Sequence, residues 1–286
     1  MNEKILLAGA TGYLGRYILA ELLQNGYFVR IIVRNKSQIS PEIQKLPRLE
    51  IIQAQITSPE SLENVCKGID KVISCVGITR QKDGLSYMQV DFQANKNLLD
   101  EAVRQGVKKF VYVSVFKGRQ IRHTAVGEAK ERFVDTLKAS GMNYCIVRPT
   151  GFYSDIGELF QMAKKSGKIS LFGSGNLSIN PIHGEDLAKI CVRQIHSDEK
   201  EVDIGGKEVF TQNEIAELAF SVLGKKPKIA HYPDWMRKLT LKVGKILLPK
   251  SVYGKIEFFL TTIAMEMTAP ETGSHTLRAY FEELNI

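Results

Sequence analysis

A short apolar run, a loop with three evenly spaced glycines and an amphipathic segment follow one another at the start of the chain. The run is residues 4–8, the glycines are Gly9, Gly12 and Gly15, and residues 13–24 carry apolar side chains at helical spacing. In such a loop the first glycine permits a tight turn, the second lets backbone amides approach a ligand, and the third lets the helix pack closely. This order predicts the first unit of a Rossmann-type α/β fold.

Apolar runs and helical segments continue to alternate through the first half of the chain. Further strands are expected at 28–33, 49–54, 71–75, 109–114 and 144–147, with helices beginning at Ser58 and covering 88–105 and 125–139. Strands separated by helices in this way form a parallel sheet with helices on both faces. We therefore expect residues 1–150 to form a doubly wound parallel Rossmann sheet.

The pattern changes after Pro149. Loops lengthen, as at 173–176, and helical segments dominate from Thr211 onwards. A C-terminal part of this kind usually caps the carboxyl edge of the sheet, where ligands of the fold bind. We expect residues 151–286 to form a smaller, mostly helical substrate or lid part, with some later segments returning to the Rossmann domain.

Composition narrows the class of protein. The net charge is +8, but the basic residues are spread over the whole chain and are not interleaved with aromatics, so no nucleic-acid partner is expected. Binding of a phosphorylated cofactor or of an anionic substrate also explains the excess of positive charge. The four cysteines are scattered through predicted strands and helices, which favours reduced thiols over a disulfide frame or a metal site. With no signal peptide and no apolar run of about 18 residues, a cytoplasmic protein is expected.

The end of the second strand indicates which dinucleotide binds. Proteins that use NAD place Asp or Glu there to accept hydrogen bonds from the ribose 2′-hydroxyl. This chain has Arg34 instead, within Val33-Arg34-Asn35-Lys36, and Arg16 lies just inside the first helix. An arginine can hold a 2′-phosphate through charge-assisted hydrogen bonds, whereas a carboxylate would repel it. We therefore expect NADP(H), with a merely solvated Arg34 as the alternative.

The pyrophosphate of such a cofactor would lie on the glycine loop. The N-terminus of a helix offers unpaired N–H groups and a partial positive charge to phosphates. The residues expected to bind the cofactor there are Gly9, Thr11, Gly12, Tyr13, Leu14 and Gly15. A glycine turn without a ligand is the alternative interpretation.

Several segments resemble the short-chain dehydrogenase/reductase superfamily, in its extended and atypical NmrA-like branch. They are the loop 9–15, the strand 110–114, Arg148-Pro149-Thr150-Gly151-Phe152-Tyr153 and the segment 180–188. The tail, through 205–206, 211–215 and 267–273, is similar to the divinyl chlorophyllide reductase-like members. The resemblance implies a Rossmann fold, a nicotinamide dinucleotide and oxidoreductase activity.

Reductases of that superfamily carry a tyrosine four residues before a lysine, so that both side chains share one helix face. The resemblance implies that Lys130 holds the nicotinamide ribose and that Ser114, after the fifth strand, polarises the substrate. The tyrosine position is Val126 in this chain, and valine cannot donate a proton.

Val126 leaves two interpretations open. In the first, the protein is an NADPH-dependent reductase of the atypical short-chain type, acting on a bulky, apolar small molecule, with acids included in this class. The proton then comes from water or from another side chain. Tyr153 is the candidate proton donor, and Tyr87 and His123 are alternatives to it. In the second, the protein binds NADP(H) without chemistry and has a regulatory or assembly role.

The resemblance also assigns cofactor contacts to two further loops. Relatives often have Gly-Asp after the third strand, where this chain has Ala54-Gln55. The carboxamide oxygen of Gln55 can still accept a hydrogen bond from the adenine amino group, with Ile56 beside it. After the fourth strand, Val76-Gly77-Ile78-Thr79 is expected to pass under the cofactor, where Gly77 leaves room for the ribose.

Residues 233–250 form a basic amphipathic stretch. Apolar side chains recur there at helical spacing, with Arg237, Lys238, Lys242 and Lys245 between them. Such a helix can pack on the domain, cover a substrate pocket or rest on an anionic membrane surface. All three interpretations stay open, and the oligomeric state is not predicted.

Overall fold

The computed structural model describes residues 3–78 and 84–286 and divides into two compact units. Unit 1 comprises residues 1–148 and 187–202, and unit 2 comprises residues 149–186 and 203–286. Residues 187–202 thus belong with the N-terminal part although they follow the first segment of unit 2. Thr79, which was expected near the cofactor, lies outside the described residues.

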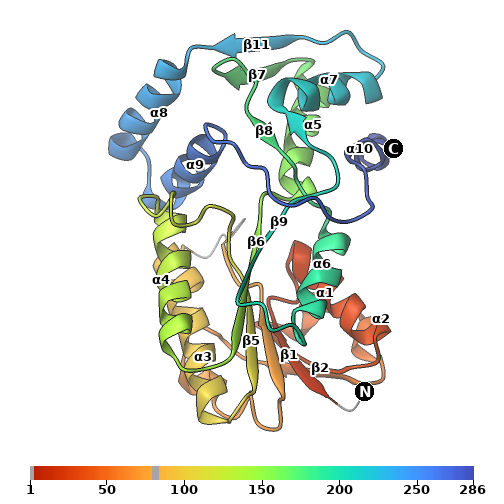
Figure 1. Ribbon diagram of the computed structural model, residues 1–286, viewed down its shortest axis with the longest axis vertical. Coiled ribbons are helices and arrows are strands. Elements are labelled where there is room, and N and C mark those ends of the chain that lie inside the picture. The colour runs from red at the N-terminus through yellow and green to blue at the C-terminus, as the bar shows by residue number, and fades with distance from the viewer. Residues whose placement is uncertain (1–2, 79–83) are drawn as a thin grey trace. The chain divides into compact units, whose positions relative to one another are not determined.

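A seven-stranded sheet in the order β3-β2-β1-β4-β5-β6-β9 forms the centre of the fold (Figure 1). Its strands are β1 (Lys4–Ala8), β2 (Phe28–Val33), β3 (Leu49–Gln53), β4 (Lys71–Ser74), β5 (Lys109–Val113), β6 (Tyr144–Pro149) and β9 (Glu201–Ile204). The pairs from β3 through β6 are parallel, and the order reverses direction at β1. The predicted doubly wound Rossmann sheet is confirmed.

Helices cover both faces of this sheet within unit 1. Figure 1 shows α3 (Asn95–Arg104) and α4 (Ala125–Ala139) on one face and α1 (Tyr13–Gln24) on the other. The core between α3, α4 and the strands contains Leu98, Phe110 and Phe133, all fully buried. Because these apolar side chains recur at helical and strand spacing, they lie on one face of each element. Burying that apolar surface between the helices and the sheet stabilises the fold.

Two predicted helices differ from the structure. The segment expected to be a helix from Ser58 forms only a 3-10 turn, η2 (Glu60–Leu62). The segment 88–105 begins as a π-helix, η3 (Met88–Ala94), before α3 continues it. Short turns η1 (Lys36–Gln38) and α2 (Pro41–Gln44) follow β2.

Unit 2 is mostly helical, as predicted. Its elements are α5 (Tyr153–Ser166), β7 (Ile169–Phe172), β8 (Ser178–Ile179), β10 (Phe210–Thr211), α7 (Gln212–Val222), β11 (Ile229–Tyr232), α8 (Asp234–Leu247), α9 (Lys250–Thr262) and α10 (Leu277–Asn285), and α6 (Gly184–Arg193) begins in it. Phe160, Phe220 and Phe281 are buried together where α5, α7 and α10 pack. None of the helices in residues 3–78 and 84–286 is long and apolar enough to cross a membrane.

Candidate dinucleotide-binding site

The glycine loop joins β1 to α1, and its backbone leaves no room for larger residues. Gly9 has a φ of +93°, in the region that favours glycine, and a Cβ there would lie 2.9 Å from the Cys75 sulfur. A Cβ on Gly15 would lie 2.0 Å from the carbonyl oxygen of Gly9, so no side chain fits. The Gly12 N–H donates to that same oxygen over 3.0 Å. The loop therefore folds back on itself and brings α1 against it.

The N-terminus of α1 is left open for an anion. Gly12 occupies the capping position, where it supplies no side chain, and no acidic residue lies in the first turn. Helices usually satisfy these N–H groups with a capping oxygen. Thr11 is exposed at the loop, Tyr13 is half-buried and Leu14 is buried. A phosphate is the natural partner for such a helix end, so the residues present fit a dinucleotide.

Successive strand ends carry the other residues expected to bind the cofactor. Arg34 follows β2 and is exposed, and Gln55 lies just beyond β3 and is also exposed. The backbone N–H of Gln55 donates to the Ser61 hydroxyl, and the carbonyl of Ile56 accepts from Asn97. Because β3, β2 and β1 are parallel neighbours, these loops lie on the same edge of the sheet as the glycine loop.

Lys130 lies in a buried polar cluster beside the end of β4. Its ammonium nitrogen is 3.0 Å from Oδ1 of the fully buried Asp91 and lies over the ring of Tyr112. Burial opposes the charged form, but Tyr112 and Asp91 outweigh it and raise the pKa of Lys130 above its ordinary value. Burial also raises the pKa of Tyr112, to about 12. Lys130 is therefore a fixed cation at neutral pH.

Gly77 is the point at which this cluster meets the loop after β4. A Cβ on Gly77 would lie 2.7 Å from Asp91 and 3.0 Å from the Lys130 nitrogen. The other oxygen of Asp91 accepts the backbone N–H of Ile78 over 3.0 Å, and the carbonyl of Val76 accepts from Asn95. The structure thus brings together Gly77, Lys130 and, through Cys75, the glycine loop.

Asp91 and Asn95 were not singled out in the sequence. Both are fully buried, and Asn95 accepts the Ser74 hydroxyl over 2.5 Å while its amide group donates to the Asp91 carbonyl. The available signal was an acid and an amide on the apolar face that also carries Val90, Ala94 and Leu98. A buried polar residue at helical spacing with apolar ones needs partners in the fold.

Ser114 directs its hydroxyl toward an internal ion pair. Its Oγ is 3.4 Å from Oε1 of Glu131, which is itself paired with Arg148 over 2.6 Å. All three side chains are buried. Val126 is buried one turn before Lys130 on α4, so the structure places no hydroxyl at the position where the superfamily carries its tyrosine.

The three other proton-donor candidates lie in different surroundings. Tyr153 is buried at the start of α5, and its hydroxyl donates to the His275 carbonyl over 3.0 Å. Burial raises the pKa of Tyr153 beyond its ordinary range. Tyr87 is buried before η3, and His123 is exposed before α4. The catalytic role expected of Tyr153 stays a prediction; Tyr153 belongs to unit 2, whereas Lys130 belongs to unit 1.

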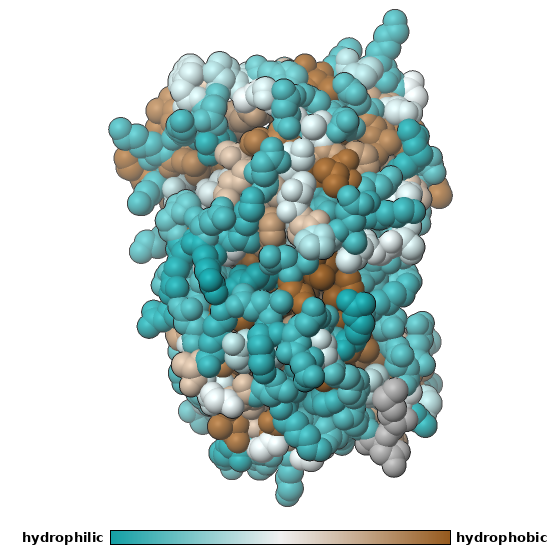
Figure 2. Space-filling view, in the orientation of Figure 1, coloured by the Kyte–Doolittle hydropathy of each residue, from teal (hydrophilic) through white to brown (hydrophobic). Residues whose placement is uncertain are grey.

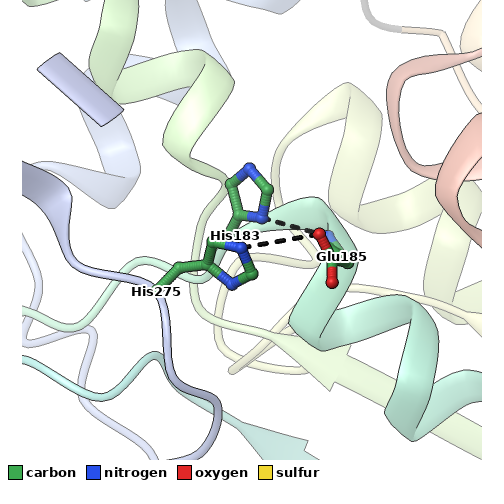
Figure 3. A group of neighbouring side chains, drawn as sticks. All are labelled: His183, Glu185 and His275. Atoms are coloured by element: carbon green, nitrogen blue, oxygen red, sulfur yellow. Dashed lines mark hydrogen bonds and ion pairs between the residues drawn. The ribbon is translucent and has the colours of Figure 1, made fainter. Parts of the chain in front are cut away.

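Unit 2 holds a second polar cluster, formed by His183, Glu185 and His275 (Figure 3). The two imidazole rings stack with centroids 4.1 Å apart, and Nε2 of His275 is 3.5 Å from Glu185. The Glu185 N–H donates to Nδ1 of His183, and Nδ1 of His275 is 3.0 Å from Asp186.

Asp186, the neighbour of Glu185, holds the segment before α10 on the start of α6. Asp186 accepts the backbone N–H groups of Ser274 and His275, each over 3.0 Å. Burial and the neighbouring His275 lower the pKa of His183, which is therefore neutral at pH 7. Ligand atoms of the three residues in Figure 3 lie within 4.8 Å of one another, although no metal site was expected from the sequence. Their existing contacts explain the cluster as a structural brace.

These features define a Rossmann-type dinucleotide-binding protein with its site at the carboxyl edge of a parallel sheet. Residues 9–198, more than half of the chain, match the NAD(P)H-binding family, and the chain belongs to it. Its relatives place it in the atypical short-chain, NmrA-like branch, a family of reductase type, as the motifs predicted.

Two curated relatives and one solved structure illustrate the range of that branch. The divinyl chlorophyllide a 8-vinyl-reductase of Arabidopsis thaliana is 28% identical over 95% of this chain and 72% of its own. The Photosystem II assembly factor Ycf39 of Trieres chinensis is 27% identical over 84% and 75%. The NADPH-dependent quinone oxidoreductase QOR2 of Escherichia coli, solved with NADPH, has a TM-score of 0.77 at 18% identity, covering 99% of this chain and 100% of its own, which shows a shared fold.

Proposed function

We propose that this protein is an NADPH-dependent reductase. Its substrates are bulky, apolar small molecules, a class that includes acids. The observation that carries the proposal is Lys130, which Asp91 and Tyr112 hold as a largely buried cation directly beside Gly77. A cation fixed at this edge favours a contact with the cofactor beyond those of the glycine loop. The lysine fits the ribose hydroxyls of a nicotinamide nucleotide, and the missing side chain of Gly77 lets the loop after β4 lie close to Asp91 and Lys130.

NADP(H) is the proposed cofactor rather than NAD(H). Arg34 is exposed at the end of β2, and no carboxylate stands at positions 33–36. An arginine at this place favours a 2′-phosphate. The quinone oxidoreductase from Escherichia coli, which shares the fold, is described with NADPH.

The side chains present favour reduction of a carbon–carbon double bond. NADPH, when bound, supplies a hydride to an electrophilic carbon of the substrate. Lys130 binds and orients the ribose, and Ser114 is the proposed polar contact at the end of β5. Because Val126 cannot donate a proton, the reaction must not depend on an acid at that place. A conjugated vinyl group meets this condition, since its second carbon can take a proton from water. The Arabidopsis relative is named as a vinyl reductase.

The proposal is tested by mixing the protein and NADPH with conjugated enones and with tetrapyrrole acids that carry a vinyl group. Loss of the absorbance of reduced nicotinamide is expected with at least one substrate. Lys130→Met should weaken NADPH binding and abolish turnover while the protein stays folded. Lys96→Met is the control, because Lys96 pairs with Asp100 on the exposed face of α3. Turnover that survives in Lys130→Met would overturn the proposal.

A non-catalytic assembly or regulatory role is the second candidate. Val126 favours it, and so does the similarity to an assembly factor of Photosystem II. Tight NADPH binding without consumption of NADPH by any compound in the panel would support this role.

The four cysteines are free thiols, which fits a reducing compartment such as the proposed cytoplasm.

A further inference from the structure

Helix α8 has two apolar faces, and only one of them packs on the protein. Gly244 is its buried residue, and the ring of Tyr253 on α9 lies against that position. Successive residues turn by about 100° around a helix, so Ile246 points about 200° away from Gly244. Trp235 and Leu239 share the direction of Ile246, because they precede it by eleven and seven residues. This second face is therefore turned away from α9.

The second face is exposed over its whole length. Trp235 is 61% exposed and Ile246 78%, with Leu239 also exposed between them; Val243 and the 73% exposed Leu247 lie further round the helix and widen the exposed apolar surface. On α9 and the link before it, Leu248, Val252 and Phe259 extend the exposed apolar surface. Figure 2 shows hydrophobic atoms gathered over this corner of unit 2, at the upper left. Large apolar patches on soluble proteins mark sites of interaction.

Lysines line one edge of this patch. Lys238, Lys242 and Lys245 are exposed on α8 beside the apolar face, and Lys250 and Lys255 are exposed on α9. Between Asp234 and Thr262 there are six cations and two carboxylates, and Asp234 is already paired with Arg237 and Lys238. The patch therefore combines exposed apolar side chains with a local excess of positive charge.

We propose that α8 and α9 dock on an anionic lipid membrane, with the Trp235–Ile246 face inserted at the level of the head groups. A helix with an apolar face and lysines at its border has this property, and tryptophan favours the interface. A protein partner fits less well, because the centres of protein interfaces are depleted in lysine. A second copy of the chain would bring two positively charged faces together. The docking is independent of cofactor binding and of the proposed reductase activity.

The single tryptophan makes the proposal directly measurable. Trp235 is the only tryptophan in the chain, so its emission reports on this face alone. Phosphatidylcholine vesicles containing phosphatidylglycerol should sediment the protein and shift its emission to the blue, and brominated lipids should quench it. Vesicles of phosphatidylcholine alone should bind much more weakly. Replacing Lys242 and Lys245 by glutamine should reduce affinity about fivefold for each lysine.

Two matched variants separate the face from general effects of charge. Ile246→Glu should weaken vesicle binding at least tenfold, about 1.4 kcal/mol, without changing thermal unfolding or NADPH affinity. Met162→Glu places the same charge at an exposed apolar residue of α5 and should leave vesicle binding unchanged. Absence of sedimentation and of a blue shift would overturn the proposal. So would equal binding by Ile246→Glu, or a dimer in light scattering that this variant dissociates while vesicles are not bound.

Discussion

Replacement of Asp91 by asparagine tests the buried cluster that holds Lys130. Asp91 is fully buried, lies 3.0 Å from the Lys130 nitrogen and accepts the Ile78 N–H over 3.0 Å. Removing one partner of a buried ion pair costs about 3–5 kcal/mol, because the other charge is left uncompensated. The Lys130 side chain keeps 15% of its surface exposed, and an asparagine oxygen can still accept from Ile78. We therefore expect Asp91→Asn to lower the free energy of unfolding by about 3 kcal/mol.

The measurement is urea unfolding followed by circular dichroism, because the only tryptophan belongs to unit 2 and does not report on unit 1. Asp100→Asn is the control, since Asp100 forms an exposed pair with Lys96 over 2.6 Å. Such pairs contribute about 0–1 kcal/mol. NADPH affinity should also fall in Asp91→Asn, because its lysine loses the partner that orients it, and not in the control. Equal unfolding free energies in the two variants would refute the reasoning.

Three further predictions concern the loop, the cofactor and pH. Gly15→Ala should abolish NADPH binding in calorimetry, since its Cβ would lie 2.0 Å from the Gly9 oxygen. The unaltered protein should bind NADPH at least about tenfold more tightly than NADH, and Arg34→Asp should erase this preference. Equal affinities of the unaltered protein for the two cofactors would contradict the role of Arg34. The folded-state pKa of His183 is lowered, so the unfolded chain binds more protons and thermal stability should fall as pH drops below about 6.5. In His183→Gln, thermal stability should fall less between pH 7.5 and pH 5.5, a range that extends about one unit on either side of the ordinary pKa of histidine.

The sheet and the glycine loop could be predicted because local patterns encode them. The strands of unit 1 are short apolar runs, and the glycines of the loop meet steric conditions set by their immediate neighbours. The predicted order of the strands therefore agrees with the structure from β1 to β6. Sequence motifs also placed Lys130 on α4 and showed that its tyrosine is absent.

The π-helix η3 could not be predicted, because a distant contact causes it. The amide of Asn95 donates to the carbonyls of Val90 and Asp91, which backbone N–H groups would otherwise satisfy in an α-helix. Asn95 also bonds to Ser74 and Val76 at the end of β4, which fixes this rotamer. A side chain that inserts into the backbone ladder changes the helix locally.

The helix expected from Ser58 fails for a local reason that propensity does not include. The Ser58 hydroxyl bonds to Glu60 over 2.8 Å, and the Ser61 hydroxyl accepts the backbone N–H of Gln55. Such hydrogen bonds compete with a helical ladder and favour turns. Asn64, with a φ of +62°, then ends the turn. The substrate could not be predicted either, since no sequence motif specifies it.

Transfer of deuterium from the nicotinamide ring tests the central claim most directly. NADPH labelled with deuterium at C4 is mixed with the protein and with each compound that consumes it, and the product is analysed by mass spectrometry. A reductase transfers one deuterium to carbon in the product and loses this transfer in Lys130→Met. Unlabelled NADPH should give no such mass increase. If NADPH binds but no compound acquires deuterium, the protein is not the proposed reductase and the assembly or regulatory role takes its place.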